Sequence, residues 1–185
     1  DLFKNLADKT RPGKAMKLEF RKGGLLKANA FALPDGTIVF TDELIQLAKD
    51  DMEIAAIMLH EMGHLENKDS VRSAIQQFSL AMFVMVITGD VSTSSSVITA
   101  IPFMLVRAGY SQEMEWQADT YAYDYMVMNN IDTSHFANIM ASLASSHNKD
   151  KKALQEEDEE SIKDYFSSHP ASAERVKRFR NSALK

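Results

Sequence analysis

The clearest periodicity along the chain lies between residues 50 and 66, where apolar side chains recur at helical spacing. Ile54, Ile57, Met58 and Met62 fall on one face of a 3.6-residue repeat. Asp50 stands three residues before an acidic side chain, which is the pattern of a capping box at a helix start. The pattern therefore predicts a helix over residues 50–66.

Residues 16–41 instead alternate as strands do, after a short stretch (residues 1–15) that we expect to be the end of a helix. The expected sheet contains strands at Lys17–Arg21, Leu25–Leu33 and Thr37–Phe40. Gly23-Gly24 predicts a hairpin between the first two strands, and Pro34-Asp35-Gly36 predicts a turn before the third. A short helix follows, capped by Thr41 or Asp42.

The rest of the chain favours helices. We expect them over residues 112–129 and 134–145 and again after Pro170. The acidic run Glu156–Glu160 is typical of a solvated loop or helix start. A small three-stranded sheet on a mostly helical body predicts the α+β class, in a single domain spanning residues 1–185.

Residues 78–106 contain two apolar runs, Phe78–Ile87 and Val97–Val106, separated by a Ser/Thr-rich stretch. Each run is half of the ~20 residues that a helix needs to span a bilayer. Two interpretations stay open. The runs form two buried core helices, or they form a hairpin that dips into a membrane.

The composition limits the chemistry that the protein can perform more than it limits the choice of fold. The chain has 185 residues, a formal net charge of −5 and no cysteine. The charge gives no support to nucleic-acid binding, and the lack of cysteine excludes disulfides, thiol catalysis and Cys-ligated zinc. Any metal must be held by carboxylates and by the five histidines. Because the sequence starts at Asp1, we expect a segment upstream, such as a signal peptide or membrane anchor.

The predicted helix at 50–66 carries the sequence His60-Glu61-Met62-Gly63-His64. Four residues make about one helical turn, so both imidazoles project from one face and can bind one Zn²⁺. Glu61 is offset by one residue, which places its carboxylate beside the metal, where it can take a proton from water.

A catalytic zinc site usually has a third protein ligand. Glu115 and Asp119 share a face of the second long helix, so Glu115 can complete the ligand set and Asp119 can orient a ligand histidine. Glu113 is an alternative ligand, although it has no acidic residue one turn later.

Four motifs in order resemble the HtpX and CaaX-prenyl-protease family of zinc metallopeptidases. They are the strand and turn at Asn29–Gly36, the H-E-x-x-H at 60–64, the sequence SQEMEWQAD at 111–119, and His169-Pro170 followed by an arginine. Gln112 and Gln117 depart from the family pattern, which commonly has Arg and Glu at these positions. The resemblance spans about residues 16–180 and implies a gluzincin-type fold with the active-site helix beneath the sheet.

The resemblance implies one Zn²⁺ per chain, bound by His60, His64 and Glu115, with Glu61 as the general base and acid. His169 and Arg175 would lie near the metal and stabilise the oxyanion or hold the substrate carbonyl, and His169 could also act as a ligand in a closed state. The strand residues Asn29, Ala30, Phe31 and Ala32 would pair with an extended peptide.

The implied function is a zinc endopeptidase that acts on peptides or unfolded proteins, in envelope or membrane quality control. The implied location is the bacterial cell envelope, either membrane-anchored or periplasmic. Two alternatives stay open: a zinc-binding, non-hydrolytic module of the chaperone kind, and a membrane-associated assembly protein that works through residues 78–106. The oligomeric state is not predicted.

Overall fold

The computed structural model of the chain describes residues 4, 6, 9, 16–88, 109–153, 165–170 and 173–180. Its elements are β1 (Lys17–Arg21), the 3-10 helix η1 (Gly24–Leu26), β2 (Ala30–Ala32), β3 (Thr37–Thr41), α2 (Asp42–Leu47), α3 (Asp51–Asn67), α4 (Asp69–Thr88), α6 (Gln112–Met128), α7 (Ser134–Ala153), α8 (Tyr165–Ser168) and α9 (Ala173–Arg180). A small sheet with a mostly helical body confirms the predicted α+β class.

The sheet has the order β1-β3-β2, with β1 parallel and β2 antiparallel to β3. The predicted hairpin at Gly23-Gly24 is therefore wrong. Gly23 has right-handed helical angles and leads into η1, which carries the chain past the central position to the far edge. The predicted turn at Pro34-Asp35-Gly36 is present and joins β2 to β3 as an antiparallel hairpin, with Gly36 at the positive φ of 91° that the turn needs. The central strand β3 is buried throughout.

Helix α3 matches the predicted 50–66 helix within a residue at each end. The Asp50 carboxylate accepts the backbone N–H of Glu53 at 2.9 Å. The Glu53 side chain accepts from the backbone N–H of Lys49, one residue further back than a capping box requires. The helix ends at Lys68, whose left-handed conformation (φ 56°) turns the chain directly into α4.

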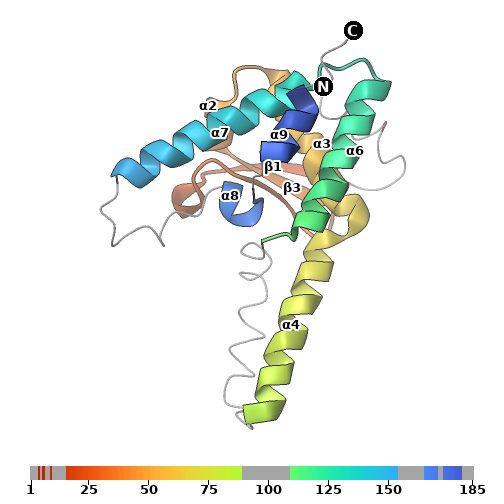
Figure 1. Cartoon of the computed structure of the whole chain (residues 1–185), viewed down its shortest axis with the longest axis vertical. Coiled ribbons are helices and arrows are strands. Elements are labelled where there is room, and N and C mark those ends of the chain that lie inside the picture. The colour runs from red at the N-terminus through yellow and green to blue at the C-terminus, as the bar shows by residue number, and fades with distance from the viewer. Residues whose placement is uncertain are drawn as a thin grey trace.

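The core forms where α3 packs against the sheet, α6 and α7 (Figure 1). Helix α7 continues through His147 to Ala153, further than the predicted 134–145, while the acidic run at 156–160 lies outside the described residues. The short helix α8 was not predicted. Of residues 1–15, only three are described, and Leu6 packs into the core.

Helix α4 leaves the body and extends well beyond it (Figure 1). Val71, Ile75 and Phe78 lie at helical spacing along it, and they are exposed, as is Ile87. The exposure of Phe78 and Ile87 contradicts burial at the two ends of the Phe78–Ile87 run, and this part of α4 projects from the body (Figure 1). The second apolar run, 97–106, lies outside the described residues. None of the described helices combines the length and apolarity needed to cross a bilayer.

Candidate metal centre

Helix α3 places His60 and His64 in the interior, with their Nε2 atoms 3.1 Å apart. The two rings meet edge to face. Both residues are fully buried, as is Glu61 between them. Two imidazole nitrogens at this separation in the protein interior can share one metal ion.

Gly63 allows the third carboxylate to reach this pair. A Cβ at position 63 would lie 2.7 Å from the Cα of Ala118 on α6, closer than real Cβ atoms come. The absence of a side chain at Gly63 thus lets α6 lie directly against α3. The close approach brings Glu115, one turn before Ala118, to the two histidines.

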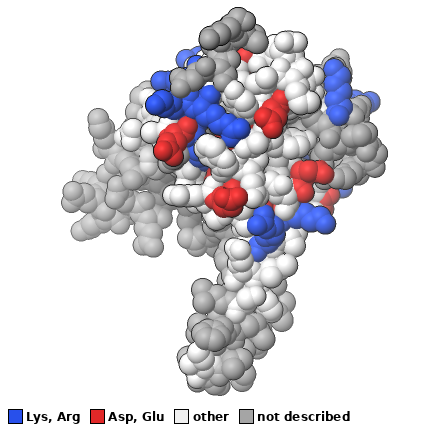
Figure 2. All heavy atoms as spheres, turned by 45° about the vertical axis from the view of Figure 1, so that its right-hand side comes forward, with Lys and Arg blue, Asp and Glu red and all other residues white. Residues whose placement is uncertain are grey.

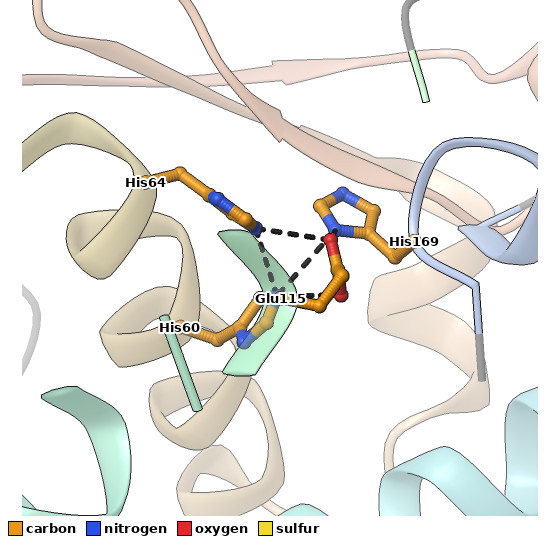
Figure 3. Close-up of side chains that lie close together, drawn as sticks. All are labelled: His60, His64, Glu115 and His169. Carbon is orange, nitrogen blue, oxygen red and sulfur yellow. Dashed lines mark hydrogen bonds and ion pairs between the residues drawn. The ribbon is translucent and has the colours of Figure 1, made fainter. Parts of the chain in front are cut away.

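Glu115 points between the rings (Figure 3). Its Oε1 lies 3.3 Å from Nε2 of His64, and its Oε2 lies 3.5 Å from Nε2 of His60. The alternative ligand Glu113 is exposed and accepts a hydrogen bond from Gln117. The structure therefore brings Glu115, and not Glu113, to the two histidines.

His169 joins the same group from the segment after α8 (Figure 3). Its Nδ1 lies 3.0 Å from Oε1 of Glu115 and 3.4 Å from Nε2 of His60. One donor atom from each of His60, His64, Glu115 and His169 lies within 4.8 Å of the others. The His169 ring stacks on Tyr165, and its backbone N–H donates to the Tyr165 carbonyl at 2.8 Å.

Glu61 is the site carboxylate with the fewest contacts in the described part of the chain. One oxygen lies 3.4 Å from Nε2 of His169, and neither oxygen has a hydrogen bond there. Buried carboxylates are normally satisfied, so an unsatisfied one next to a ligand group suits a proton acceptor whose partner arrives with metal and substrate.

A second layer of charges holds the candidate ligands. Oδ1 of Asp119 lies 2.9 Å from Nδ1 of His60, which leaves Nε2 free to face the group. Arg175 binds both oxygens of Asp119, through Nε at 2.6 Å and Nη2 at 2.9 Å, and its Nη1 lies 2.6 Å from Oε2 of Glu115. These contacts position the two carboxylates, whereas the oxyanion role implied for Arg175 requires a donor directed at substrate.

Sequence reasoning missed Asp69, which lies at the start of α4. Its Oδ2 is 2.9 Å from Nδ1 of His64, and its Oδ1 accepts from Arg72 at the same distance. Asp69 is fully buried and does for His64 what Asp119 does for His60. The sequence does place an acidic residue five positions after His64. This spacing indicates a contact with His64 only once the turn at Lys68 is known.

Sequence reasoning also missed two aromatic residues that pack on the site. Tyr110 stacks on the His64 ring, with centroids 3.9 Å apart, and its hydroxyl lies 3.0 Å from that of Ser70. Tyr165 covers His169 and donates its backbone N–H to the carbonyl of Ala28, just before β2. The two tyrosines fix the planes of both rings.

The charges in the site shift several pKa values. Burial alone would lower the pKa of His60, but hydrogen bonds to Asp119 and Glu115 outweigh it and raise the pKa to about 9. The pKa of His64 is also raised, against burial, by Asp69 and Glu115. Burial opposes ionisation of Glu115, yet the neighbouring histidines hold its pKa well below the usual value. The site thus keeps its carboxylate ionised, as a metal ligand must be.

The predicted substrate strand lies beside this site. β2 is an edge of the described sheet and packs on α3. Asn29, Ala30 and Ala32 are buried, and Phe31 is partly buried. The carbonyl of Asn29 accepts from the backbone of Thr41, and the carbonyl of Ala32 accepts from the Ser70 hydroxyl.

The profile of Peptidase family M48 matches residues 15–183 of the chain. The chain belongs to this family. The match confirms the resemblance to HtpX-like zinc metallopeptidases and covers every candidate site residue. M48 enzymes are metal-dependent, and the buried group of His60, His64, Glu115 and His169 fits that requirement because it offers nitrogen and carboxylate donors close together.

Individual relatives point the same way. Metalloprotease LoiP of Escherichia coli (strain K12) is 32% identical over 157 residues, which are 83% of this chain and 58% of LoiP. Metalloprotease YcaL of the same organism is 26% identical over 157 residues, 83% of this chain and 57% of YcaL. Mitochondrial metalloendopeptidase OMA1 of Arabidopsis thaliana is 35% identical over 98 residues, 49% of this chain and 18% of OMA1. The chain thus spans under three fifths of these relatives' lengths.

Proposed function

We propose that the chain is the catalytic part of a zinc-dependent endopeptidase that cleaves unfolded or extended protein segments. The observation that carries this proposal is the buried group of His60, His64 and Glu115 with the Glu61 carboxylate beside it. Two imidazoles and one carboxylate form a known ligand set of catalytic zinc, which leaves a fourth position for chemistry.

Zn²⁺, when bound, polarises the scissile carbonyl and lowers the pKa of water. The protein supplies the proton transfers. Glu61 takes the proton from the attacking water on its carboxylate and then delivers it to the leaving amine. Asp119 and Asp69 keep the Nδ1 protons of His60 and His64 in place, so that both rings present Nε2 to the metal.

The β2 edge supports binding of an extended peptide. Alternation in an antiparallel pair turns the backbone groups of Ala30 and Ala32 away from β3. The carbonyls at either side are occupied, that of Ala28 by the Tyr165 backbone and that of Ala32 by Ser70. The Ala30 amide and carbonyl therefore lie in a short stretch of sheet edge. Ala30 is 0% exposed in the described arrangement, so a substrate strand can pair with it, independently of sequence, only after the site opens.

The described arrangement is a closed one, because every candidate ligand and Glu61 are 0% exposed. His169 lies against Glu115, His60 and Glu61, on the position that water and a substrate carbonyl need. We infer that the His169 segment must move before substrate enters.

Replacement of Glu61 by Gln tests the function. We expect the variant to retain its zinc, measured by elemental analysis, and to lose cleavage of a denatured protein such as casein. Glu113→Gln is the matched control, because it makes the same change at an exposed carboxylate, and it should keep both properties. If zinc-loaded wild type cleaves nothing, the non-hydrolytic module is the better interpretation.

A second proposal concerns the α4 arm, which we infer contacts a membrane surface in the cell envelope. Its sequence is almost wholly apolar from Phe78 to Ile87, about 15 Å of helix, or half a ~30 Å hydrocarbon core. In the space-filling view, acidic and basic groups are mixed over the body (Figure 2), while the sequence of α4 from Ser73 to Thr88 contains no charged residue. Val71, Ile75, Phe78 and Ile87 are exposed on this helix, and clustered exposed apolar side chains mark an interaction surface.

Vesicle flotation tests the membrane proposal. We expect the chain to float with phosphatidylethanolamine–phosphatidylglycerol vesicles and the double variant Ile75→Glu/Phe78→Glu to remain in solution. Leu25→Glu changes an apolar residue that is more exposed than either of these but lies in η1, so it should float like wild type. Failure of wild type to float would contradict membrane contact and favour a protein partner for the arm.

A further inference from the structure

Helix α9 is joined to α6 by two arginines one turn apart, and only the inner one belongs to the second layer of the metal site. Arg175 binds Glu115 and Asp119 in the interior. On the outer side, the Arg178 guanidinium carbon lies 4.9 Å from the Trp116 ring centroid and 4.7 Å from that of Tyr123. Its Nη1 donates to the Thr120 hydroxyl at 2.8 Å.

The outer contacts lie on the same turns of α6 as the inner ones. Trp116 is the residue after Glu115, and Thr120 is the residue after Asp119. Arg178 therefore binds α6 along the span that presents the carboxylates. A shift of α9 along or around α6 would break the Arg178 contacts and withdraw Arg175 together.

Helix α9 needs such contacts because it has only eight residues, too few for an isolated helix to be stable. Phe179 anchors it from the inside, with its ring packed at a tilt against Phe136 and its carbonyl accepting a hydrogen bond from the Thr133 hydroxyl. Arg175, one turn earlier, is the other buried contact of the helix. Arg178 supplies the outer contact.

We propose that Arg178 is a positioning residue for the metal centre: it holds α9 so that Arg175 can keep Glu115 and Asp119 oriented, and so couples metal binding to α9 docking. The proposal rests on the metal site proposed above. Arg175 contacts both buried carboxylates directly, so its displacement would remove the contacts that hold Glu115 and Asp119 in position beside the histidines. Linkage makes this coupling reciprocal. If docking of α9 raises the affinity for the metal by some factor, metal binding must raise the equilibrium constant for α9 docking by the same factor.

The test measures the affinity of the whole chain for Zn²⁺ by competition with a chromophoric chelator. A cation between two rings is worth enough that Arg178→Met should weaken zinc binding by about two- to thirtyfold. Arg178→Lys keeps the cation and should restore most of the affinity. Arg180→Met is the matched control, an exposed arginine of the same helix, and should bind zinc like wild type.

Trp116 gives a second readout, because it is the chain's single tryptophan and is 46% exposed. Addition of Zn²⁺ to the apo protein should shift its emission in wild type and in Arg180→Met, and shift it much less in Arg178→Met. Equal zinc affinity in wild type and Arg178→Met would overturn the proposal. So would an equal loss in Arg180→Met, or a weakening that Arg178→Lys does not restore.

Melting of the apo proteins separates coupling from misfolding. If Arg178→Met does not fold, Trp116→Leu replaces it in the test, because it removes one ring of the same contact. Trp116→Leu should then weaken zinc binding, and unchanged zinc affinity in this variant would overturn the proposal. Because the readout is zinc affinity and not cleavage, an overturned coupling leaves the peptidase proposal intact. A peptidase that fails to cleave likewise leaves the coupling measurable.

Discussion

The two candidate ligand histidines of α3 are each paired through Nδ1 with a buried carboxylate, His60 with Asp119 and His64 with Asp69. This pairing sets the tautomer of each ring and fixes its direction, which a metal site requires of its second layer. The two carboxylates come from different helices, α6 and α4, so the site depends on side chains beyond the four that lie within reach of one ion.

The role of Asp69 can be tested at the residue scale. Asp69→Ala should weaken zinc binding by about 10- to 100-fold, because His64 loses the acceptor that orients it. Asp51→Ala is the control, an exposed acidic residue in the first turn of α3. Unchanged affinity in Asp69→Ala, measured by chelator competition, would show that the Tyr110 stack alone holds the His64 ring.

His169 belongs to the same scale, since its position in the closed site predicts a blocking role. His169→Ala should expose the fourth position, so that a chelator removes zinc faster and a short peptide is cleaved faster. The measurements are stopped-flow zinc release and cleavage of a fluorogenic peptide. Loss of cleavage with an unchanged release rate would instead support the oxyanion role that the family resemblance implies.

At the scale of elements, the sequence predicted what is local and missed what depends on distant contacts. Helix α3 was predictable because its cap, its apolar spacing and both histidines lie within seventeen residues. The parallel pairing of β1 with β3 was not, because the Gly23-Gly24 signal describes a turn and says nothing of which strand the chain pairs with. The exposure of α4 was also hidden, since an apolar run looks alike in a core and on a projecting arm.

The α3–α6 contact makes a prediction about Gly63. Gly63→Ala places a Cβ against the Ala118 backbone, so α6 must move outward and carry Glu115 from the two histidines. We expect weaker zinc binding and a lower melting temperature, although alanine favours helix more than glycine does. Calorimetry and chelator competition measure both. A variant that gains stability and keeps its zinc affinity would contradict the close contact.

For the whole molecule, the site concentrates charge in an interior that α3, α6 and α9 close around. Glu61, Glu115 and Asp119 are buried with Arg175 and three histidines. Buried charges are costly unless they are paired, and the helices around the site share this pairing. Helix α9 contributes Arg175. Metal binding and global stability should therefore be linked.

Metal removal tests that link. A ligand that binds only the folded state stabilises it by about 4 kcal/mol at a thousandfold excess over its Kd, so a strong chelator should lower the melting temperature by several degrees. His64→Ala removes a ligand and should melt at one temperature with or without chelator. Glu61→Gln, which keeps all candidate ligands, should respond to the chelator as wild type does. If wild type melts identically in both conditions, the fold is held by its own ion pairs, and the metal serves chemistry alone.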